Sequence, residues 1–279
     1  MAHLVDSRER SPSAAVDSEL RAPPRDRFVA ERVTAILVAV TALAMWEWAA
    51  RAGAVSALFF PAPSQVLRTL SDLISSGTLA THMAATLQRV GLGFLLGGLP
   101  GLLLGLAMGW SPRLRALVDP FVATLHPIPK IAVLPLFMMV FGLGETSKVV
   151  VIAAAVFFPM LINAMAGVRQ IHPVHFEVAE AYGANPLQVC TQVVIPGSLP
   201  MLLTGARLAF NVGLLLTLAV ELVAAQQGLG RMIWLAWQTM RTEELYAALF
   251  VIAGLGVGFS FALAGLTKYL APWHIARVE

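Results

Sequence analysis

The sequence predicts an all-α integral membrane protein with about six transmembrane helices and a two-helix loop on the cytoplasmic side. Of its 279 residues, 58% are hydrophobic and only 13% are charged, whereas charged residues make up about 25% of ordinary soluble domains. The mean hydropathy of +0.76 agrees with this composition. Several apolar stretches reach the length of about 20 residues that a helix needs to cross the ~30 Å hydrocarbon core of a bilayer.

Six stretches meet this requirement, and they define the domain organisation. The predicted spans cover residues 33–50, 88–110, 119–141, 148–168, 201–223 and 246–268. Residues 1–32 mix arginines with acidic residues and prolines, so we expect a disordered cytoplasmic tail before a retained first span, and not a signal peptide. A transmembrane permease domain over 33–271 contains the loop at about 172–200, and residues 272–279 form a short cytoplasmic tail.

Between the first two spans, prolines and mixed polarity over residues 59–83 predict a short helix that lies on the membrane surface, with Ser64 as its N-cap. In the second span, Gly97, Gly101 and Gly105 recur every four residues, which allows a neighbouring helix to approach closely. Packing within one subunit and packing between subunits both agree with this spacing.

Prolines interrupt the third and fourth spans. Three of them, Pro127, Pro129 and Pro135, fall in the third span, and Pro159 falls in the fourth. Because proline removes a helical hydrogen bond, we expect both helices to be kinked or broken.

The basic residues predict the orientation, since Lys and Arg are enriched in cytoplasmic loops. Placing the N-terminus in the cytoplasm assigns twelve basic residues to that side and six to the outside, and leaves Lys130 within a span. Both termini are therefore predicted to be cytoplasmic, and so is the loop at 172–200.

The basic residues are scattered and not gathered into a patch, so we expect no nucleic-acid partner. The single cysteine, Cys190, excludes an internal disulfide.

The loop that follows the fourth span reads as two short helices joined by a turn. Pro173 suits the first position of a helix, and Gly183 suits the left-handed conformation that ends one. Asn185 is a good N-cap and Pro186 a good first residue for the second helix, which Pro196 is expected to stop. The apolar faces of these helices have nothing to bury them within the loop, so the hairpin either rests on lipid and neighbouring helices or docks into a soluble partner.

This stretch resembles the EAA loop of binding-protein-dependent ABC importer permeases. The motif begins with a glutamate and small residues, continues with a glycine and a nine-residue gap, and ends in an aliphatic-x-aliphatic-Pro sequence. In this chain these positions are Glu177, Val178, Ala179, Gly183, Val193, Ile195 and Pro196. Further stretches over about residues 55–270, including LQRVGLGFLLGGLPGLLLGLAMGWS and PIPKIAVLPLFMMVFGLGETSKVVVI, resemble the nitrate, sulfonate, taurine and bicarbonate branch. Valine replaces the usual residue at the second position of the motif, and isoleucine replaces leucine near its end.

The resemblance implies the type I ABC importer permease fold and a transport subunit in the bacterial inner membrane, not an enzyme. Its implied partners are a second permease copy, so that a homodimer forms the pathway, two ABC ATPase subunits, an extracytoplasmic substrate-binding protein and a small, anionic solute such as a sulfonate, taurine, nitrate or bicarbonate. ATP and Mg²⁺ would be bound by the partner subunits, and this chain would bind no cofactor or metal and carry no catalytic residue. The segment GLGETSK at 142–148 lacks the glycine that a phosphate-binding loop needs before its lysine.

The loop would act as a lever between the ATPase subunits and the pore. Glu177 would pair with a basic residue of the ATPase subunit, Ala179 and Gly183 would permit close approach, and Leu187 would supply an apolar contact. The predicted coupling set comprises Glu177, Ala179, Gly183, Pro186, Leu187, Ile195 and Pro196.

Candidate pathway residues lie within the spans. An ionisable residue at mid-bilayer costs about 3 kcal/mol or more, so Lys130 either binds an anionic substrate or neutralises carbonyl groups freed by the broken third span. Phe137 and Met138 either gate the pathway or pack, and Asn163 and Asn211 either contact substrate or form interhelical hydrogen bonds. Glu47 and Glu221 lie near span ends, where we expect solvated carboxylates.

Two other classes of protein remain open from the sequence. An ion-coupled secondary transporter would explain the broken helices, but it leaves the two-helix loop without a purpose and has few intramembrane acids for coupling. A membrane enzyme would need paired carboxylates or a nucleophile beside a base, and no span presents them. Transport that requires ATP and a binding protein separates the importer from the secondary transporter.

Overall fold

The computed structural model describes residues 25–270, with side chains from residue 33 onward, and every regular element in this part of the chain is a helix. Five helical segments are long and apolar enough to cross a membrane, namely α2 (Arg25–Arg51, apolar from Val33), α4 to α5 (Thr78–Trp110), α8 (Glu145–Arg169), α10 to α11 (Pro186–Ala224) and α13 (Thr242–Leu270). A sixth span results if the bent pair of α6 (Pro112–Leu125) and the segment Lys130–Phe141, which contains α7 (Leu134–Phe141), is counted as one. The predicted all-helical class with about six spans is confirmed.

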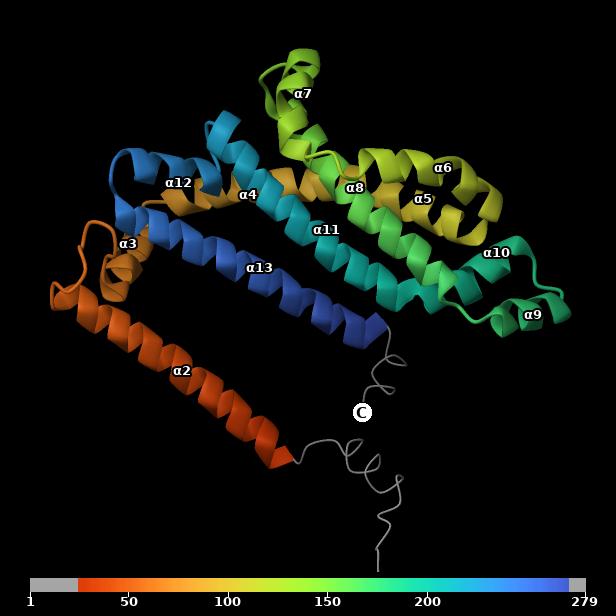
Figure 1. Ribbon diagram of the computed structural model, residues 1–279, viewed down its shortest axis with the longest axis horizontal. Coiled ribbons are helices and arrows are strands. Elements are labelled where there is room, and N and C mark those ends of the chain that lie inside the picture. The colour runs from red at the N-terminus through yellow and green to blue at the C-terminus, as the bar shows by residue number, and fades with distance from the viewer. Residues whose placement is uncertain (1–24, 271–279) are drawn as a thin grey trace, which may run out of the picture.

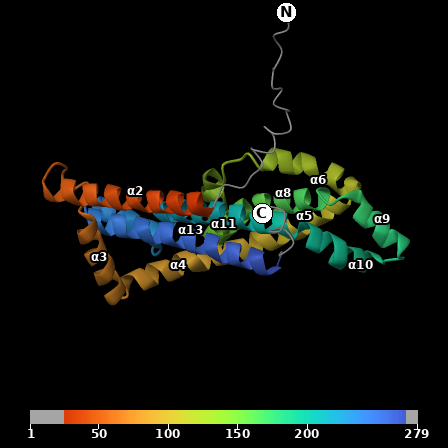
Figure 2. The same cartoon turned by 90° about the horizontal axis from the view of Figure 1, so that it is seen from below.

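The hairpin and the short helix α12 (Leu229–Gln238) lie at opposite ends of the long helices, as Figure 1 shows. We call these two ends the hairpin end and the α12 end. In both views α8, α11 (Ile195–Ala224) and α5 (Leu99–Trp110) run side by side between them (Figures 1 and 2). Helix α2 begins at Arg25, earlier than the predicted start at 33. The remainder of the predicted N-terminal tail and the C-terminal tail at 272–279 lie outside the described residues.

Helix α8 packs closely against α5 and the π-helical segment before it (Phe94–Gly98) through a row of glycines. A Cβ atom placed on Gly97, Gly101 or Gly105 would lie 2.0, 2.5 or 2.4 Å from a backbone carbonyl oxygen of α8, each far inside van der Waals contact. Only hydrogen side chains let the two backbones approach so closely. The four-residue spacing of these glycines predicted the close approach of a neighbouring helix. This prediction is confirmed for a contact between two helices of the same chain.

The third span breaks at its prolines, whereas the fourth does not. Helix α6 ends at Leu125 and the next helical residue is Lys130, with a bend of 83° between the two parts. Helix α8 runs without interruption through Pro159. The predicted break is thus confirmed in the third span and absent from the fourth, where the side chain of Asn163 donates a hydrogen bond to the Pro159 carbonyl oxygen at 2.8 Å.

The expectation that Pro196 stops the second hairpin helix is wrong. Helix α10 (Pro186–Val189) continues through a π-helical segment (Cys190–Val194) directly into α11, so that one helical segment extends from Pro186 to Ala224. Local π-helical adjustments are one way in which membrane helices accommodate proline. The hairpin is consequently joined to the fifth long span with no loop between them.

The short helix α3 (Pro63–Ser75) lies where the surface helix was predicted, but its N-cap is Ala62 and not Ser64. Ser64 instead donates hydrogen bonds from its backbone nitrogen and its hydroxyl to the two carboxylate oxygens of Glu47, at 2.9 and 2.8 Å. Glu47 also forms an ion pair with Arg51. The carboxylate that we expected to be solvated therefore fastens α2 to the start of α3.

Candidate functional site

The hairpin forms because its turn residues match the conformations that they must adopt. Helix α9 (Pro173–Ala181) begins with proline at its first position, and Gly183 follows its end with a φ of +69°, in the left-handed region that favours glycine. Asn185 caps α10 by accepting a hydrogen bond from the backbone nitrogen of Gln188 at 2.9 Å, and the Gln188 side chain accepts one in return from the Asn185 nitrogen at 2.8 Å. This reciprocal pair fixes the turn, and the predicted roles of these positions are confirmed.

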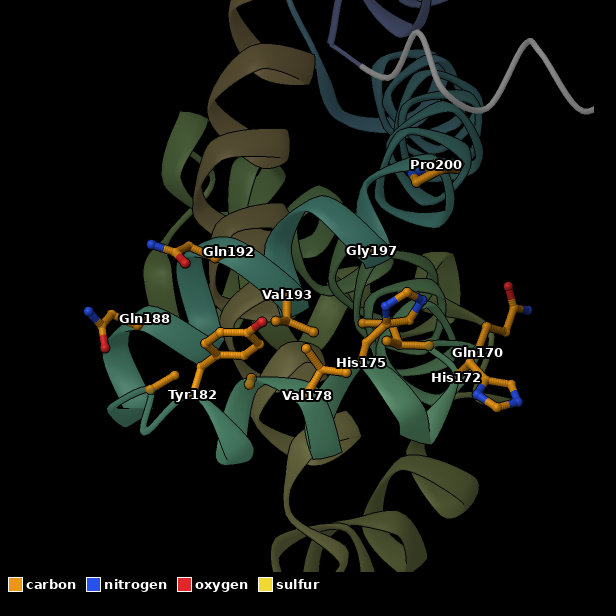
Figure 3. Close-up of a pocket in the computed structure, with 13 residues that line it drawn as sticks. Gln170, His172, His175, Val178, Tyr182, Gln188, Gln192, Val193, Gly197 and Pro200 are labelled. Carbon is orange, nitrogen blue, oxygen red and sulfur yellow. The ribbon is translucent and has the colours of Figure 1, made fainter.

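The two arms of the hairpin enclose an open hollow of about 980 Å³ (Figure 3). In Figure 3, Val178 of α9 and Tyr182, which directly follows that helix, point toward Val193 on the facing helical segment. Gln188 and Gln192 extend away from this contact at the rim. The inner face of the hairpin is thus partly apolar, with polar groups around its edge.

The hairpin also carries large apolar side chains that the described part of the chain leaves uncovered. Tyr182 is 88% exposed and Leu187 is 72% exposed, and both lie beside the turn. Glu177 is exposed on α9, and no hydrogen bond or ion pair holds it within the described part of the chain. Apolar groups gathered with an unpaired charge on an exposed projection are typical of a docking surface. All members of the predicted coupling set lie in this hairpin or at the adjoining start of α11.

Lys130 lies at the break in the third span and is held by backbone groups. Its Nζ donates to the carbonyl oxygens of Leu125, His126 and Ile128 at 2.9, 2.8 and 2.8 Å. The same atom lies 4.6 Å from the centre of the Phe158 ring on α8. These contacts match the expectation that Lys130 neutralises carbonyl groups freed by the broken helix. Its role toward a substrate stays a prediction.

The other predicted pathway residues do not join Lys130 in one site. Phe137 and Met138 pack against buried Leu134, Val151 and Val220 where α7, α8 and α11 meet. Asn163 bonds within its own helix, as described above, and Asn211 is exposed on α11. Phe137 and Met138 thus pack against their own chain, and their role as a gate, like the roles of the two asparagines in transport, stays a prediction.

A buried cluster of charges at the α12 end was missed from the sequence. Arg89 of α4 (Thr78–Gly93) has a side chain only 5% exposed and forms ion pairs with Glu221 of α11 and Glu145 of α8. Lys148 of α8, also 5% exposed, pairs with the same Glu145 at 3.0 Å. The expectation of a solvated carboxylate is wrong for Glu221, which is fully buried.

Glu221 is held by three donors, two on α4 and one on α12. It accepts hydrogen bonds from Arg89 Nη1 at 2.7 Å, from Thr86 Oγ1 at 2.9 Å and from the backbone nitrogen of Gly230 at 2.9 Å. A buried carboxylate is tolerable only with such pairing. The sequence carried one signal of this cluster, since residues of opposite charge fall at the same predicted external end of three spans.

These features define the class of the protein. A helical membrane domain with a broken span and a capped two-helix projection joined to a long span is the permease fold of type I ABC importers. One chain of the inward-facing MetNI methionine ABC transporter superposes on this fold with a TM-score of 0.61 and 19% sequence identity, covering 68% of this chain and 94% of that one.

The family follows from the sequence comparisons. A model of the family described as "Binding-protein-dependent transport system inner membrane component" matches residues 101–275, which include the hairpin. The chain belongs to this family of ABC transporter permeases. It is 38% identical over 237 residues to the taurine transport system permease protein TauC of Escherichia coli (strain K12), covering 83% of this chain and 86% of that protein. It is 34% identical over 263 residues to the putative aliphatic sulfonates transport permease protein SsuC of Bacillus subtilis (strain 168), covering 94% and 95% of the two chains. The resemblance to the sulfonate and taurine branch is confirmed.

Proposed function

We propose that this chain forms the translocation pathway of an ATP-driven importer for a small anionic solute of the sulfonate or taurine type. The observation that carries the proposal is the hairpin, which is rigidly capped, exposes apolar groups at its tip and continues into α11 without a break. A projection of this kind suits a lever that is moved by another polypeptide. The choice of a solute with an anionic sulfonate group is supported by what the similar permeases from Escherichia coli and Bacillus subtilis are named as transporting.

In this proposal two ATPase subunits bind ATP and Mg²⁺ in the cytoplasm and dock against the hairpin. Leu187 and Tyr182 supply the apolar contact, and Glu177 supplies a charge for a basic partner residue. An extracytoplasmic binding protein delivers the solute at the α12 end. Both termini are then cytoplasmic, as the distribution of basic residues predicts.

A second copy of the chain would complete the pathway. Helix α7 projects from the other helices in Figure 1, and its apolar side chains are widely exposed, with Met139 at 84% and Val140 at 67%. Lipid and a second permease copy are both apolar enough to cover this surface. Phe137 and Met138 on the inner face of α7 pack against α8 and α11 of their own chain, so a second copy would bury the outer face that carries Met139 and Val140.

Leu187→Asp tests the docking role in an assembly reconstituted with the partner ATPase subunits and binding protein. A charge at a central apolar contact of an interface costs on the order of 2 kcal/mol or more, so we expect the affinity for the ATPase subunits to fall about thirtyfold or more. Leu58→Asp is the matched control, because Leu58 is 47% exposed in the segment before α3, far from the hairpin in the chain. This control should leave the affinity unchanged.

Transport assays in proteoliposomes test the rest of the proposal. Uptake of taurine or an alkanesulfonate should require ATP, the ATPase subunits and the binding protein together. Uptake by this chain alone under an ion gradient would instead establish the ion-coupled secondary transporter. Equal loss of affinity in the Leu187 and Leu58 variants would show that the hairpin is not the docking surface.

A further inference from the structure

The charge cluster at the α12 end contains two carboxylates, and they are held very differently. Glu221 is fully buried and bonded to Arg89, Thr86 and the backbone of Gly230. Glu145 is 58% exposed and, among the described residues, its carboxylate is bonded only to the two cations Arg89 and Lys148. Glu145 is therefore the member of the cluster that can leave without opening the protein core.

Arg89 presents Glu145 with the edge of its guanidinium group that suits an oxyanion. Its Nε and Nη2 donate to the two oxygens of Glu145 at 2.5 and 3.0 Å. Its Nη1 is turned inward and donates to Glu221 and to the carbonyl oxygen of Gln227 at 2.7 and 2.6 Å. Two parallel N–H donors recognise carboxylate, sulfonate and phosphate oxygens equally well in geometric terms. The inner half of Arg89 is thus fixed, while its outer edge holds a replaceable anion.

The charges in the cluster balance only while an anion occupies that edge. Arg89 and Lys148 carry two positive charges, and Glu221 and Glu145 carry two negative charges. If the Glu145 side chain turns outward, the remaining buried groups hold one uncompensated positive charge, which is costly in a site from which water is largely excluded. A monoanion that takes the place of the carboxylate restores both the balance and the charge-assisted hydrogen bonds.

The surroundings of Glu145 allow this movement. Glu145 is the first residue of α8, and the segment before it contains Gly142 and Gly144, around which a Cβ atom would meet nothing within 4 Å. Lys148 keeps alternative partners when the carboxylate leaves, since its Nζ also donates to the carbonyl oxygens of Leu143 and Gly144 at 3.4 and 3.1 Å. The two cations therefore stay in place without Glu145.

We propose that Arg89 and Lys148 form a binding site for the anionic headgroup of the solute, and that Glu145 fills this site until a sulfonate or similar monoanion displaces it. The inference rests on the proposed function for the choice of anion and for the side from which the anion arrives. The carboxylate then acts as an internal competitor, which keeps the buried cations paired between successive solute molecules.

Binding of methanesulfonate to the full chain in phosphatidylcholine nanodiscs tests the proposal without ATPase subunits or a binding protein. Calorimetry in a low-chloride buffer is carried out on the wild type, Glu145→Gln and Glu145→Asp. Removing the competing charge should tighten binding to Glu145→Gln by about tenfold or more, the factor that corresponds to one charge-assisted hydrogen bond. Glu145→Asp should bind with intermediate affinity, because the shorter side chain reaches Arg89 less well.

Three comparisons make the outcome decisive. Methanesulfonamide, a neutral molecule of similar shape, should not distinguish the variants from the wild type. Lys148→Met should weaken methanesulfonate binding in the Glu145→Gln background. Glu244→Gln is the matched control, since Glu244 forms an exposed ion pair with Arg241 at 3.1 Å at the start of α13, and it should bind as the wild type does.

Unchanged or weaker methanesulfonate binding in both Glu145 variants would overturn the proposal, as would equal gains for methanesulfonamide. If Glu145→Gln does not fold, the affinity of Glu145→Asp relative to the wild type decides the question by itself. Because the assay measures binding by the chain alone, the proposal can fail while ATP-driven transport is observed. It can equally stand if transport proves to use another energy source.

Discussion

Replacing Gly97 by alanine tests the close packing on which the whole bundle depends. The added Cβ atom would lie 2.0 Å from the carbonyl oxygen of Ala153 and 2.6 Å from its carbonyl carbon. Ordinary contact begins at 3.4 Å, so the two helices would have to move apart by about 1.4 Å along this line. The obstructing atoms belong to the backbone of α8 and cannot turn aside as a flexible side chain would.

The expected cost follows from two opposing effects. Inserting an atom into a well-packed core destabilises a protein by about 1–3 kcal/mol. Alanine is a better helix former than glycine by roughly 0.8–1 kcal/mol, which offsets part of this cost. We therefore expect Gly97→Ala to lower the stability by up to about 2 kcal/mol. The same change at Gly91, which lies on α4 with nothing within 4 Å of its Cβ position, brings only the favourable effect.

Thermal unfolding of the two variants in detergent, followed by tryptophan fluorescence, provides the measurement. The transition of Gly97→Ala should fall below that of the wild type, whereas that of Gly91→Ala should equal or exceed it. A Gly97 variant as stable as the Gly91 variant would refute the reasoning, because the π-helical segment Phe94–Gly98 and α8 would then not be in backbone contact at this position.

Three further substitutions probe local features of the structure. Lys130→Met leaves three carbonyl oxygens at the break of the third span without their donor, so its melting temperature should fall by an amount equivalent to about 1–3 kcal/mol; an unchanged value would show that water replaces the amine there. Gly228→Ala would place a Cβ atom 2.2 Å from the Glu221 carboxyl carbon at a φ of +131°, and it should lower the yield of folded protein more than Gly254→Ala, which meets nothing within 4 Å. Asn185→Ala removes the cap of α10 at a cost of about 1 kcal/mol, so hydrogen exchange in α10 should accelerate while that in α8 stays constant.

The features that the sequence predicted well depend on residues close together in the chain. The hairpin turn is the clearest case, because Gly183, Asn185 and Pro186 each favour one backbone conformation and act within four residues of each other. The break of the third span is local in the same way, since Pro127 and Pro129 cannot donate the hydrogen bonds that a continuous helix requires. The spans themselves follow from hydropathy over windows of about 20 residues.

The features that the sequence did not predict depend on tertiary contacts. Arg89 lies 56 residues from Glu145 and 132 residues from Glu221, and nothing in the local sequence of any of them shows that they meet. A single carboxylate near the end of a span is usually solvated, so the expectation for Glu221 followed the commoner case. The expectation that Pro196 ends the second hairpin helix was wrong for a related reason. The helix continues through a wider π-helical turn before Pro196, and such a turn has no clear sequence pattern.

The continuity of α11 links the two functional proposals physically. From the cap at Asn185 to the carboxylate of Glu221 the chain is helical without a break, which corresponds to a length of about 50 Å at 1.5 Å per residue. Because the hairpin continues into α11 with no loop between them, although the ribbon bends at the π-helical stretch in Figure 1, we expect movement of the hairpin to be passed on to Glu221, which fixes the inner half of Arg89. Motion imposed on the hairpin would therefore change the distance between Arg89 and Lys148, which lie on different helices. The affinity of the proposed anion site should accordingly depend on the nucleotide state of the ATPase subunits, and an affinity for methanesulfonate that is equal with and without bound ATP would show that the two ends are not coupled through α11.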